Sequence, residues 1–285
     1  MNSLDEITYS AESELRAPRQ FFARMAADVR AARELAWRLF VRNLRAQYRQ
    51  SLLGYAWALL PPLVTTLTWM FLNAAGILQT GATAIPYPLY VLVGTVLWQF
   101  FVDLLNLPLH AFSQNRALIA KLNFPREALV LASLGEALFN FCIRLVLILG
   151  VMLWYQIFPP WTFLLAPLGM FALLLLGLTF GLLLLPFGLL YQDVTRALSI
   201  ITTLWFFLTP IVYTSPDNSL WQWLVQWNPV TPLLFVTREW MTTGKFVSLD
   251  SFLFVAASSV VLCAGAWVLV RLAMPHLIAR MPSRG

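Results

Sequence analysis

Charged residues are scarce in this sequence, and the common catalytic motifs are missing. Only 11% of the 285 residues are charged, 60% are apolar, and the mean hydropathy is +0.73. There are two histidines, and no HExxH, GxSxG or CxxC pattern occurs. The two cysteines, Cys142 and Cys263, lie in separate apolar runs, so we expect buried packing and neither a disulfide framework nor a metal site. The composition is that of a polytopic, all-α membrane protein.

A Walker A motif is also missing. Gly244 and Lys245 have neither the upstream glycine nor the following Ser or Thr of a phosphate-binding loop. We therefore expect no ATP hydrolysis by this chain. If it moves a substrate against a gradient, the energy comes from another polypeptide or from an ion.

An arginine-rich segment precedes the first long apolar run. With 3.6 residues per turn, four arginines fall on one helical stripe: Arg38, Arg42, Arg45 and Arg49. An apolar stripe repeats this spacing beside it: Trp37, Val41, Leu44 and Tyr48. We predict an amphipathic interfacial helix over residues 34–53, with its apolar stripe at the headgroup level and its arginines toward lipid phosphates or an acidic partner.

Six apolar stretches are predicted to be transmembrane helices, all within residues 54–271. In chain order they cover residues 54–77, 89–109, 128–158, 163–190, 196–213 and 251–271. Pro61 and Pro62 should kink or break the first one. We interpret residues 1–33 as a cytoplasmic leader with a short helix near residues 21–33, and residues 272–285 as a basic cytoplasmic tail.

Lysine and arginine orient these spans. Nine precede residue 54, three lie between spans two and three, one follows span four and three lie at the C-terminal end, whereas the opposite loops hold two. Because positive residues remain on the cytoplasmic side, both termini are predicted to be cytoplasmic. The tryptophan-rich segment between spans five and six is then external. It is too broken to span, so we expect short re-entrant helices there.

Three ionisable residues lie inside predicted spans: Asp103, Glu136 and Arg144. Such groups are costly unless they are paired or face a cavity. Glu136 and Arg144 are eight residues apart and share a helix face, which favours a structural ion pair. A carboxylate relay for coupling ions is the alternative. The sequence leaves open whether Arg144 pairs with Glu136 or with Asp103.

Four segments in order give the sequence a family resemblance: RNLRAQYRQSLLGYAWALLPPL, KLNFPREALVLASL, LYQDVTRAL and WFFLTPIVYTSP. Together they resemble the membrane (permease) subunits of ABC type-2 exporters, and most closely the branch that exports O-antigen, capsular polysaccharide or teichoic acid. The resemblance covers residues 34–285. Gln192 departs from it, because an arginine is usual at this position in the family.

The resemblance implies a homodimer that pairs with two ATP-binding-cassette subunits in the bacterial inner membrane. Those partners would bind ATP and Mg, so this chain would need no cofactor, no metal and no nucleic acid. The substrate would be a glycan on a polyprenyl diphosphate carrier, surrounded by membrane lipids. A coupling helix near residues 115–122 would contact the ATPase, and the residues assigned to this contact are Asn115, Arg116, Lys121, Phe124, Pro125 and Arg126.

The resemblance also gives the interfacial helix a role. Arg42, Arg45 and Arg49 would hold the lipid diphosphate, with Arg38 and Tyr48 on the same surface. The simpler alternative is attraction to anionic lipid, worth about 1 kcal/mol per basic residue.

Aromatic side chains are the candidates for a glycan conduit, because sugars present apolar C–H faces on which rings can stack. Two triplets are possible, Trp98 with Phe100 and Phe101, and Trp205 with Phe206 and Phe207. Since neighbouring helical residues point in different directions, we select Trp98, Phe101, Trp205 and Phe207. For any single one of them, a core or lipid-facing position is the favoured interpretation.

Three other functions remain open at this point. An ABC type-2 exporter of a smaller lipid or drug would need a narrower, less aromatic path. A membrane-embedded acyltransferase would need more than His110 and His276, neither of which has an acidic neighbour in sequence. A lipid-binding scaffold would have no ATPase partner.

Overall fold

All described elements are helices. The structure, a computed structural model, describes residues 18–49, 54–77, 81, 83–115, 127–191, 193–214 and 219–280. In chain order the elements are α1 (Pro18–Tyr48), the 3-10 helix η2 (Gly54–Ala58), α2 (Leu60–Ala74), α3 (Tyr87–Gln114), α5 (Glu127–Trp154), the 3-10 helix η3 (Trp161–Leu165), α6 (Ala166–Leu190), α7 (Asp193–Leu208), α8 (Ser219–Trp227), α9 (Val230–Thr242) and α10 (Leu249–Arg280). No strand occurs in these ranges, which agrees with the predicted all-α class.

Four helices in the described ranges are long and apolar enough to cross a bilayer. They are Tyr87–Gln114, Glu127–Trp154, Trp161–Leu190 and Leu249–Met274, and they match predicted spans two, three, four and six. The helices at predicted spans one and five, α2 and α7, have only 15 and 16 residues. At 1.5 Å per residue each covers about 22 to 24 Å, less than the roughly 30 Å of hydrocarbon. The count of six spans therefore stays a prediction.

Proline explains why the first and fifth segments are shorter than predicted. Pro61 and Pro62 lie in the first turn of α2, where a missing backbone donor costs little, so they start this helix. Residues 54–58 form the separate turn η2 before them. In the fifth predicted span, α7 ends at Leu208, two residues before Pro210.

Two helices extend past the predicted domain boundaries. We expected the interfacial helix to begin at residue 34, but α1 runs without a break from Pro18 through this position. We also expected a basic tail from residue 272, but α10 continues to Arg280. In both places alanine, leucine, methionine and arginine supply high helix propensity, so the polar character that suggested a boundary does not end the helix.

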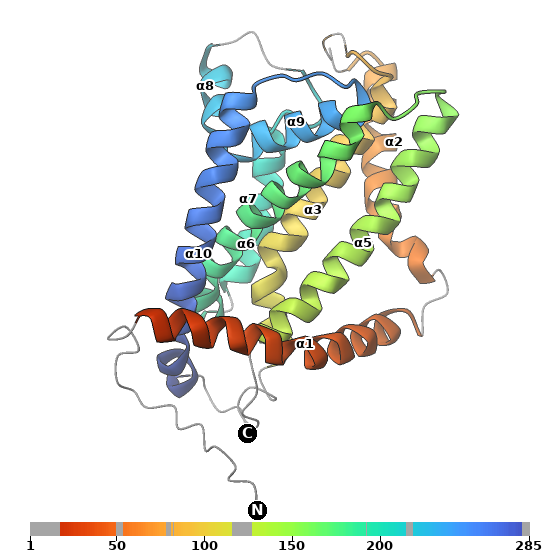
Figure 1. Cartoon of the computed structure of the whole chain (residues 1–285). Helices are drawn as coiled ribbons and strands as arrows, with labels where there is room; N and C mark the ends of the chain where they lie inside the picture. The colour runs from red at the N-terminus through yellow and green to blue at the C-terminus, as the bar shows by residue number, and fades with distance from the viewer. Residues whose placement is uncertain are drawn as a thin grey trace, which may run out of the picture.

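The centre of the chain is α3, which packs between α5 and α6 (Figure 1). Gly177 and Gly181 on α6 allow a close approach. A Cβ atom on Gly181 would lie 2.4 Å from the carbonyl oxygen of Leu105, and one on Gly177 would lie 3.0 Å from that of Phe101. This is the small-residue spacing by which membrane helices bring their backbones together.

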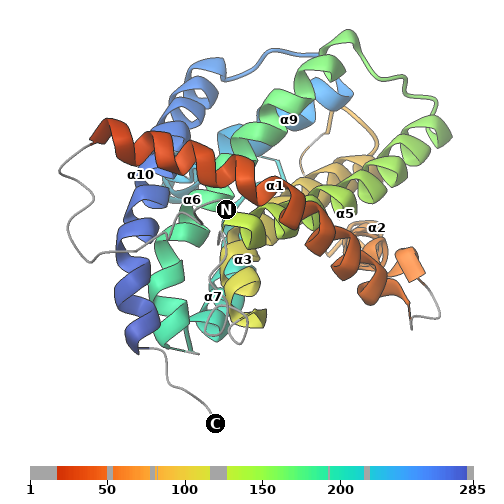
Figure 2. The same cartoon turned by 60° about the horizontal axis from the view of Figure 1, so that its bottom comes forward.

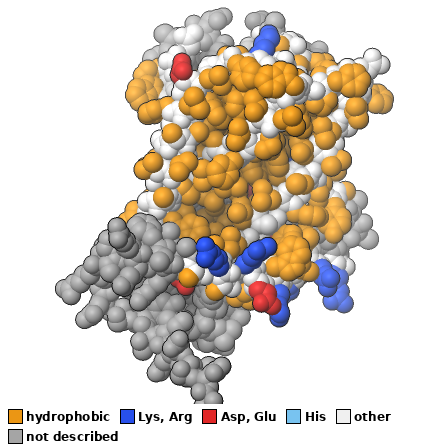
Figure 3. All heavy atoms as spheres, viewed as in Figure 1, with side chains coloured by type: hydrophobic (Ala, Val, Ile, Leu, Met, Phe, Trp, Pro, Cys, Tyr) orange, Lys and Arg blue, Asp and Glu red, His pale blue; other side chains and the backbone are white. Residues whose placement is uncertain are grey.

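The two ends of the helix bundle differ. The long helix α1 lies across one end, over the start of α5 and the last part of α10, while α8 and α9 lie at the opposite end (Figures 1 and 2). Between the two ends, the face seen in Figure 3 is covered by apolar side chains, and Lys and Arg side chains gather along α1. This distribution fits a membrane layer with α1 at its basic surface. Cys263 is buried as expected, but Cys142 is exposed on α5.

Candidate functional site

Small residues hold α1 against α5. Ala32 and Ala36 on α1 are buried together with Ala128, the second residue of α5. Leu35, Leu39 and Leu131 pack around this cluster. Because alanine side chains let two helices approach closely, the middle of α1 has a fixed position on the bundle.

A polar contact fixes the next turn of α1. The Asn43 side-chain amide donates to a Glu136 carboxylate oxygen of α5 at 2.8 Å. The Asn43 carbonyl oxygen accepts hydrogen bonds from Arg42 Nε and Nη2 at 3.1 and 3.0 Å. Glu136 therefore has its partner on α1, and this chain of contacts orients the guanidinium of Arg42.

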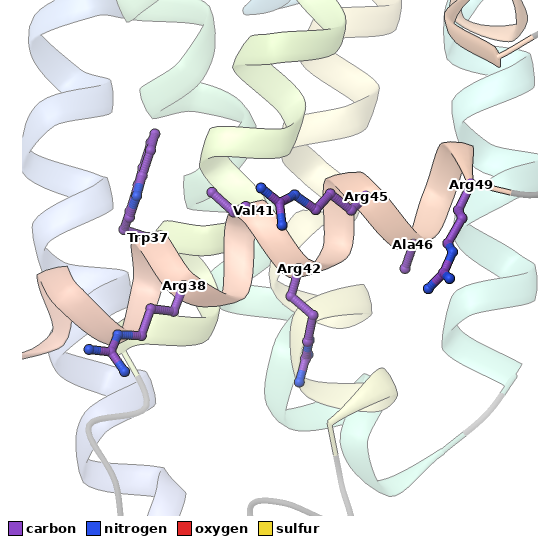
Figure 4. A pocket seen from close by; sticks show the side chains of 7 residues that line it. All are labelled: Trp37, Arg38, Val41, Arg42, Arg45, Ala46 and Arg49. Atoms are coloured by element: carbon purple, nitrogen blue, oxygen red, sulfur yellow. The ribbon is translucent and has the colours of Figure 1, made fainter.

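The arginine stripe of α1 lines an open groove of about 730 Å³. Its walls are formed by Trp37, Arg38, Val41, Arg42, Arg45, Ala46 and Arg49. Figure 4 shows Trp37 pointing to the side on which the other helices rise, whereas Arg38, Arg42 and Arg49 point the opposite way and Arg45 runs back along the helix. The groove thus combines a cationic side with an apolar edge.

The arginines of this groove differ in how far they are engaged. Arg38 forms an exposed ion pair with Glu34 at 2.6 Å, a kind of contact that contributes little. The side chains of Arg45 and Arg49 form no hydrogen bond or ion pair with any residue that the structure describes. Their guanidinium groups are free to donate to a phosphate. The Tyr48 side chain lies outside the described residues.

The intramembrane arginine pairs with Asp103. Arg144 on α5 donates to the Asp103 carboxylate of α3 at 2.7 Å, and its Nε donates to the Ala58 carbonyl of η2 at 3.3 Å. One guanidinium therefore joins three segments that are distant in sequence. Of the two partners that the sequence left open for Arg144, the structure shows Asp103, and Glu136 on the same helix accepts from Asn43 instead.

A second cluster of charges was not predicted. Arg271 of α10 donates to Asp28 of α1 at 2.5 Å and lies 3.6 Å from the Glu127 carboxylate of α5. It joins α1 to the helix that directly follows the predicted coupling segment. Sequence reasoning placed Arg271 at the end of a span, but no local spacing connects it with residues more than 140 positions away.

The aromatic candidates form a packed cluster. The ring centroid of Trp205 lies 6.0 Å from that of Trp98 and 5.4 Å from that of Phe101. Trp98 and Phe101 are buried and pack in the core of the chain. Phe207 is half exposed and contacts Trp69 of α2, with centroids 6.2 Å apart. This ring contact links α2 to α7.

A buried arginine lies at the end opposite to α1. Arg238 of α9 is 1% exposed, and its guanidinium carbon lies 3.7 Å from the centroid of the Tyr90 ring of α3. Its Nη1 lies 3.4 Å from the carbonyl oxygens of Pro210 and Ile211, just after α7. Burial lowers the pKa of Arg238, but a guanidinium still stays protonated at neutral pH. Sequence reasoning placed Arg238 in an external segment and did not predict its burial.

Most of the predicted coupling segment cannot be placed. Arg116, Lys121, Phe124, Pro125 and Arg126 lie outside the described residues. Asn115 ends α3, where its side-chain amide donates to the Ala111 carbonyl at 2.8 Å. The segment thus starts and ends at α3 and α5, on the side of the bundle that carries α1.

A family comparison matches most of the chain. The sequence model described as "ABC-2 type transporter" covers residues 34–241. This range begins within α1 and ends within α9, so it includes the arginine groove, the Arg144 contacts and the aromatic cluster.

Individual relatives are similar over most of their length. An "O-antigen export system permease protein RfbA" of Myxococcus xanthus is 28% identical over 243 residues, which is 84% of this chain and 92% of the relative. A protein with the same description from Klebsiella pneumoniae is 25% identical over 71% of this chain and 78% of its own length. A "Polysialic acid transport protein KpsM" of Escherichia coli is 25% identical over 72% of this chain and 80% of its own length.

Proposed function

Because the chain belongs to the ABC-2 type transporter membrane family, we propose that it is the permease subunit of an ATP-driven exporter of a lipid-linked polysaccharide in the bacterial inner membrane. The glycan is O-antigen or a similar polymer on a polyprenyl diphosphate. Relatives described as O-antigen and polysialic acid permeases support a polysaccharide as the cargo. The observation that carries the lipid-linked part is the arginine groove of α1, at the basic edge of the apolar surface.

The groove suits a diphosphate for a geometric reason. Arg45 and Arg49 have no partner among the described residues, and Arg42 is oriented by Asn43. Guanidinium groups bind phosphate oxygens through two parallel hydrogen bonds. Because α1 lies at the basic end of the bundle, such a headgroup would bind while its lipid remains in the adjacent membrane leaflet.

The energy comes from a partner subunit in this proposal. Two ATP-binding-cassette subunits bind ATP and Mg, and two copies of this chain form the conduit. The segment after α3 would receive the movement of the ATPase, and the Arg271 contacts with Asp28 and Glu127 would pass it to α1 and α10. The exposed apolar side chains of α2 and α7 would contact the second copy of the chain or membrane lipid.

One observation favours the alternative, an exporter of a smaller lipid or drug. Trp98 and Phe101, two of the four aromatic candidates for a conduit, are buried within the chain. A smaller substrate needs no sliding surface of aromatic rings. The two proposals therefore differ in what stimulates the ATPase.

The direct test is to reconstitute the chain with its ATPase partner in liposomes and to measure ATP hydrolysis. We expect stimulation by a polyprenyl-diphosphate-linked glycan. Stimulation by small amphiphiles alone would support the alternative, and failure to bind any ATPase would contradict both.

A separate variant tests the coupling segment. Reversing the charges of Lys121 and Arg126 to glutamate should abolish export while membrane insertion and the amount of subunit stay normal, because the contact with the ATPase is lost. The matched control is Lys245→Glu, a charge reversal at the end of the helix bundle opposite to α1. Unchanged export by the double variant would refute the assignment.

A further inference from the structure

A second groove adjoins the arginine groove. It lies between α1 and α5, has a volume of about 510 Å³, and is lined by Arg33, Ala36, Trp37, Phe40, Leu131 and Gly135. Apart from Arg33, the side chains that line it are apolar. Trp37 belongs to both grooves, so the cationic surface and the apolar one meet at this ring.

Gly135 lets the Phe40 side chain pack directly against the backbone of α5 in the second groove. A Cβ atom at this position would lie 3.0 Å from the Phe40 ring, closer than rings and methyl groups normally approach. Phe40 therefore rests on the backbone of α5. Its ring centroid is 5.5 Å from that of Trp37, which is 64% exposed. Two aromatic side chains thus line an open apolar channel beside the arginines.

We propose that this second groove binds the first isoprene units of the lipid carrier whose diphosphate occupies the arginine groove. The inference rests on the proposed function, because it names the binding place for the tail of the same ligand. The charge pattern supports it. Arg45 has no side-chain partner among the described residues and its side chain runs back along α1 toward Val41, and Trp37 lines both grooves, so a phosphate head on the arginines and the first part of its apolar tail would lie on adjoining surfaces.

The first test uses the unaltered chain with its ATPase partner in phosphatidylcholine nanodiscs. A polyprenyl diphosphate with a diazirine on its second isoprene unit is photo-activated, and the labelled peptides are identified by mass spectrometry. We expect labels within residues 33–40 and 131–135. Labels confined to α2 or α7 would overturn the proposal, and so would labelling that an excess of phosphatidylglycerol removes, since the occupant would then be bulk anionic lipid.

The second test fills the groove. Gly135→Leu should weaken binding of a long-chain polyprenyl diphosphate about tenfold, because the first isoprene units lose their contacts with Trp37 and Phe40, while binding of methyl diphosphate, which has no isoprene unit, changes less than about twofold. The control is Gly150→Leu on the same helix, where a Cβ meets nothing within 4 Å. It should leave both affinities unchanged.

The outcomes separate the two proposals. If Gly135→Leu has no effect and both diphosphates bind the unaltered chain equally well, the tail groove is wrong and the head site remains. If the unaltered chain binds no polyprenyl diphosphate, the lipid-linked cargo is wrong as well. Should Gly135→Leu fail to fold, the labelling of the unaltered chain still decides.

Discussion

The arginines on α1 and the arginines inside the helix bundle have opposite surroundings. On α1, Arg45 and Arg49 are exposed and unpaired within the described chain, whereas Arg144 and Arg238 are 8% and 1% exposed inside the bundle. The inner pair direct their donors to Asp103, to backbone carbonyls and to the face of Tyr90. The same side chain therefore joins helices where it is buried and is available for a ligand where it is open.

The largest effect is expected at the Arg144 ion pair. Arg144→Leu leaves Asp103 without its partner, and we expect a loss of about 3 kcal/mol of unfolding free energy, the lower end for buried pairs because a third of Asp103 is exposed. Replacing both residues by leucine should cost less than half as much. The measurement is unfolding in mixed detergent micelles. A double variant as unstable as the single one would show that the ion pair is not the cause.

A smaller effect is expected where a ring covers Arg238. Tyr90→Leu removes the cation–π contact with a buried guanidinium, worth about 2 kcal/mol, in addition to packing. Tyr90→Phe keeps the ring and loses only the hydrogen bond to the Tyr213 carbonyl, about 1 kcal/mol. Both are read from thermal unfolding in detergent. In an Arg238→Met background the Tyr90→Leu loss should shrink, and equal losses in both backgrounds would exclude a cation–π contribution.

The smallest effect on stability is expected at the open arginines. Arg45→Gln with Arg49→Gln should change unfolding free energy by less than about 0.5 kcal/mol, because no described contact is lost. Binding to anionic vesicles should fall about fivefold for each arginine, or about 25-fold together. Arg38→Gln is the control, since Glu34 already offsets its charge. A large loss of stability in the double variant would remove the distinction between open and buried arginines.

Periodicity and composition predicted what depends on local sequence. The stripe from Arg38 to Arg49 and the four long apolar helices follow from spacing and hydropathy, and α8 and α9 lie in the segment where short helices were expected. Helix ends were less predictable. A short helix was expected near residues 21–33, and in the structure it is continuous with the arginine-rich segment as the single helix α1.

Pairings between distant segments were not predictable in the same way. Glu136 and Arg144 share a helix face, yet they do not pair. Glu136 accepts a hydrogen bond from Asn43, and Arg144 donates to Asp103. The choice depends on how α1 and α3 pack against α5, which the spacing within α5 does not contain. The Arg271 contacts and the burial of Arg238 arise from tertiary packing for the same reason.

The most direct measurement compares glycan-stimulated ATP hydrolysis in liposomes for the natural chain and for the Arg42→Gln, Arg45→Gln, Arg49→Gln variant, each with its ATPase partner and at matched thermal stability. We predict that basal hydrolysis is retained and that stimulation by a polyprenyl-diphosphate-linked glycan is lost in the variant. Full stimulation of the variant would contradict the account, because the open arginines of α1 would then have no part in binding the substrate.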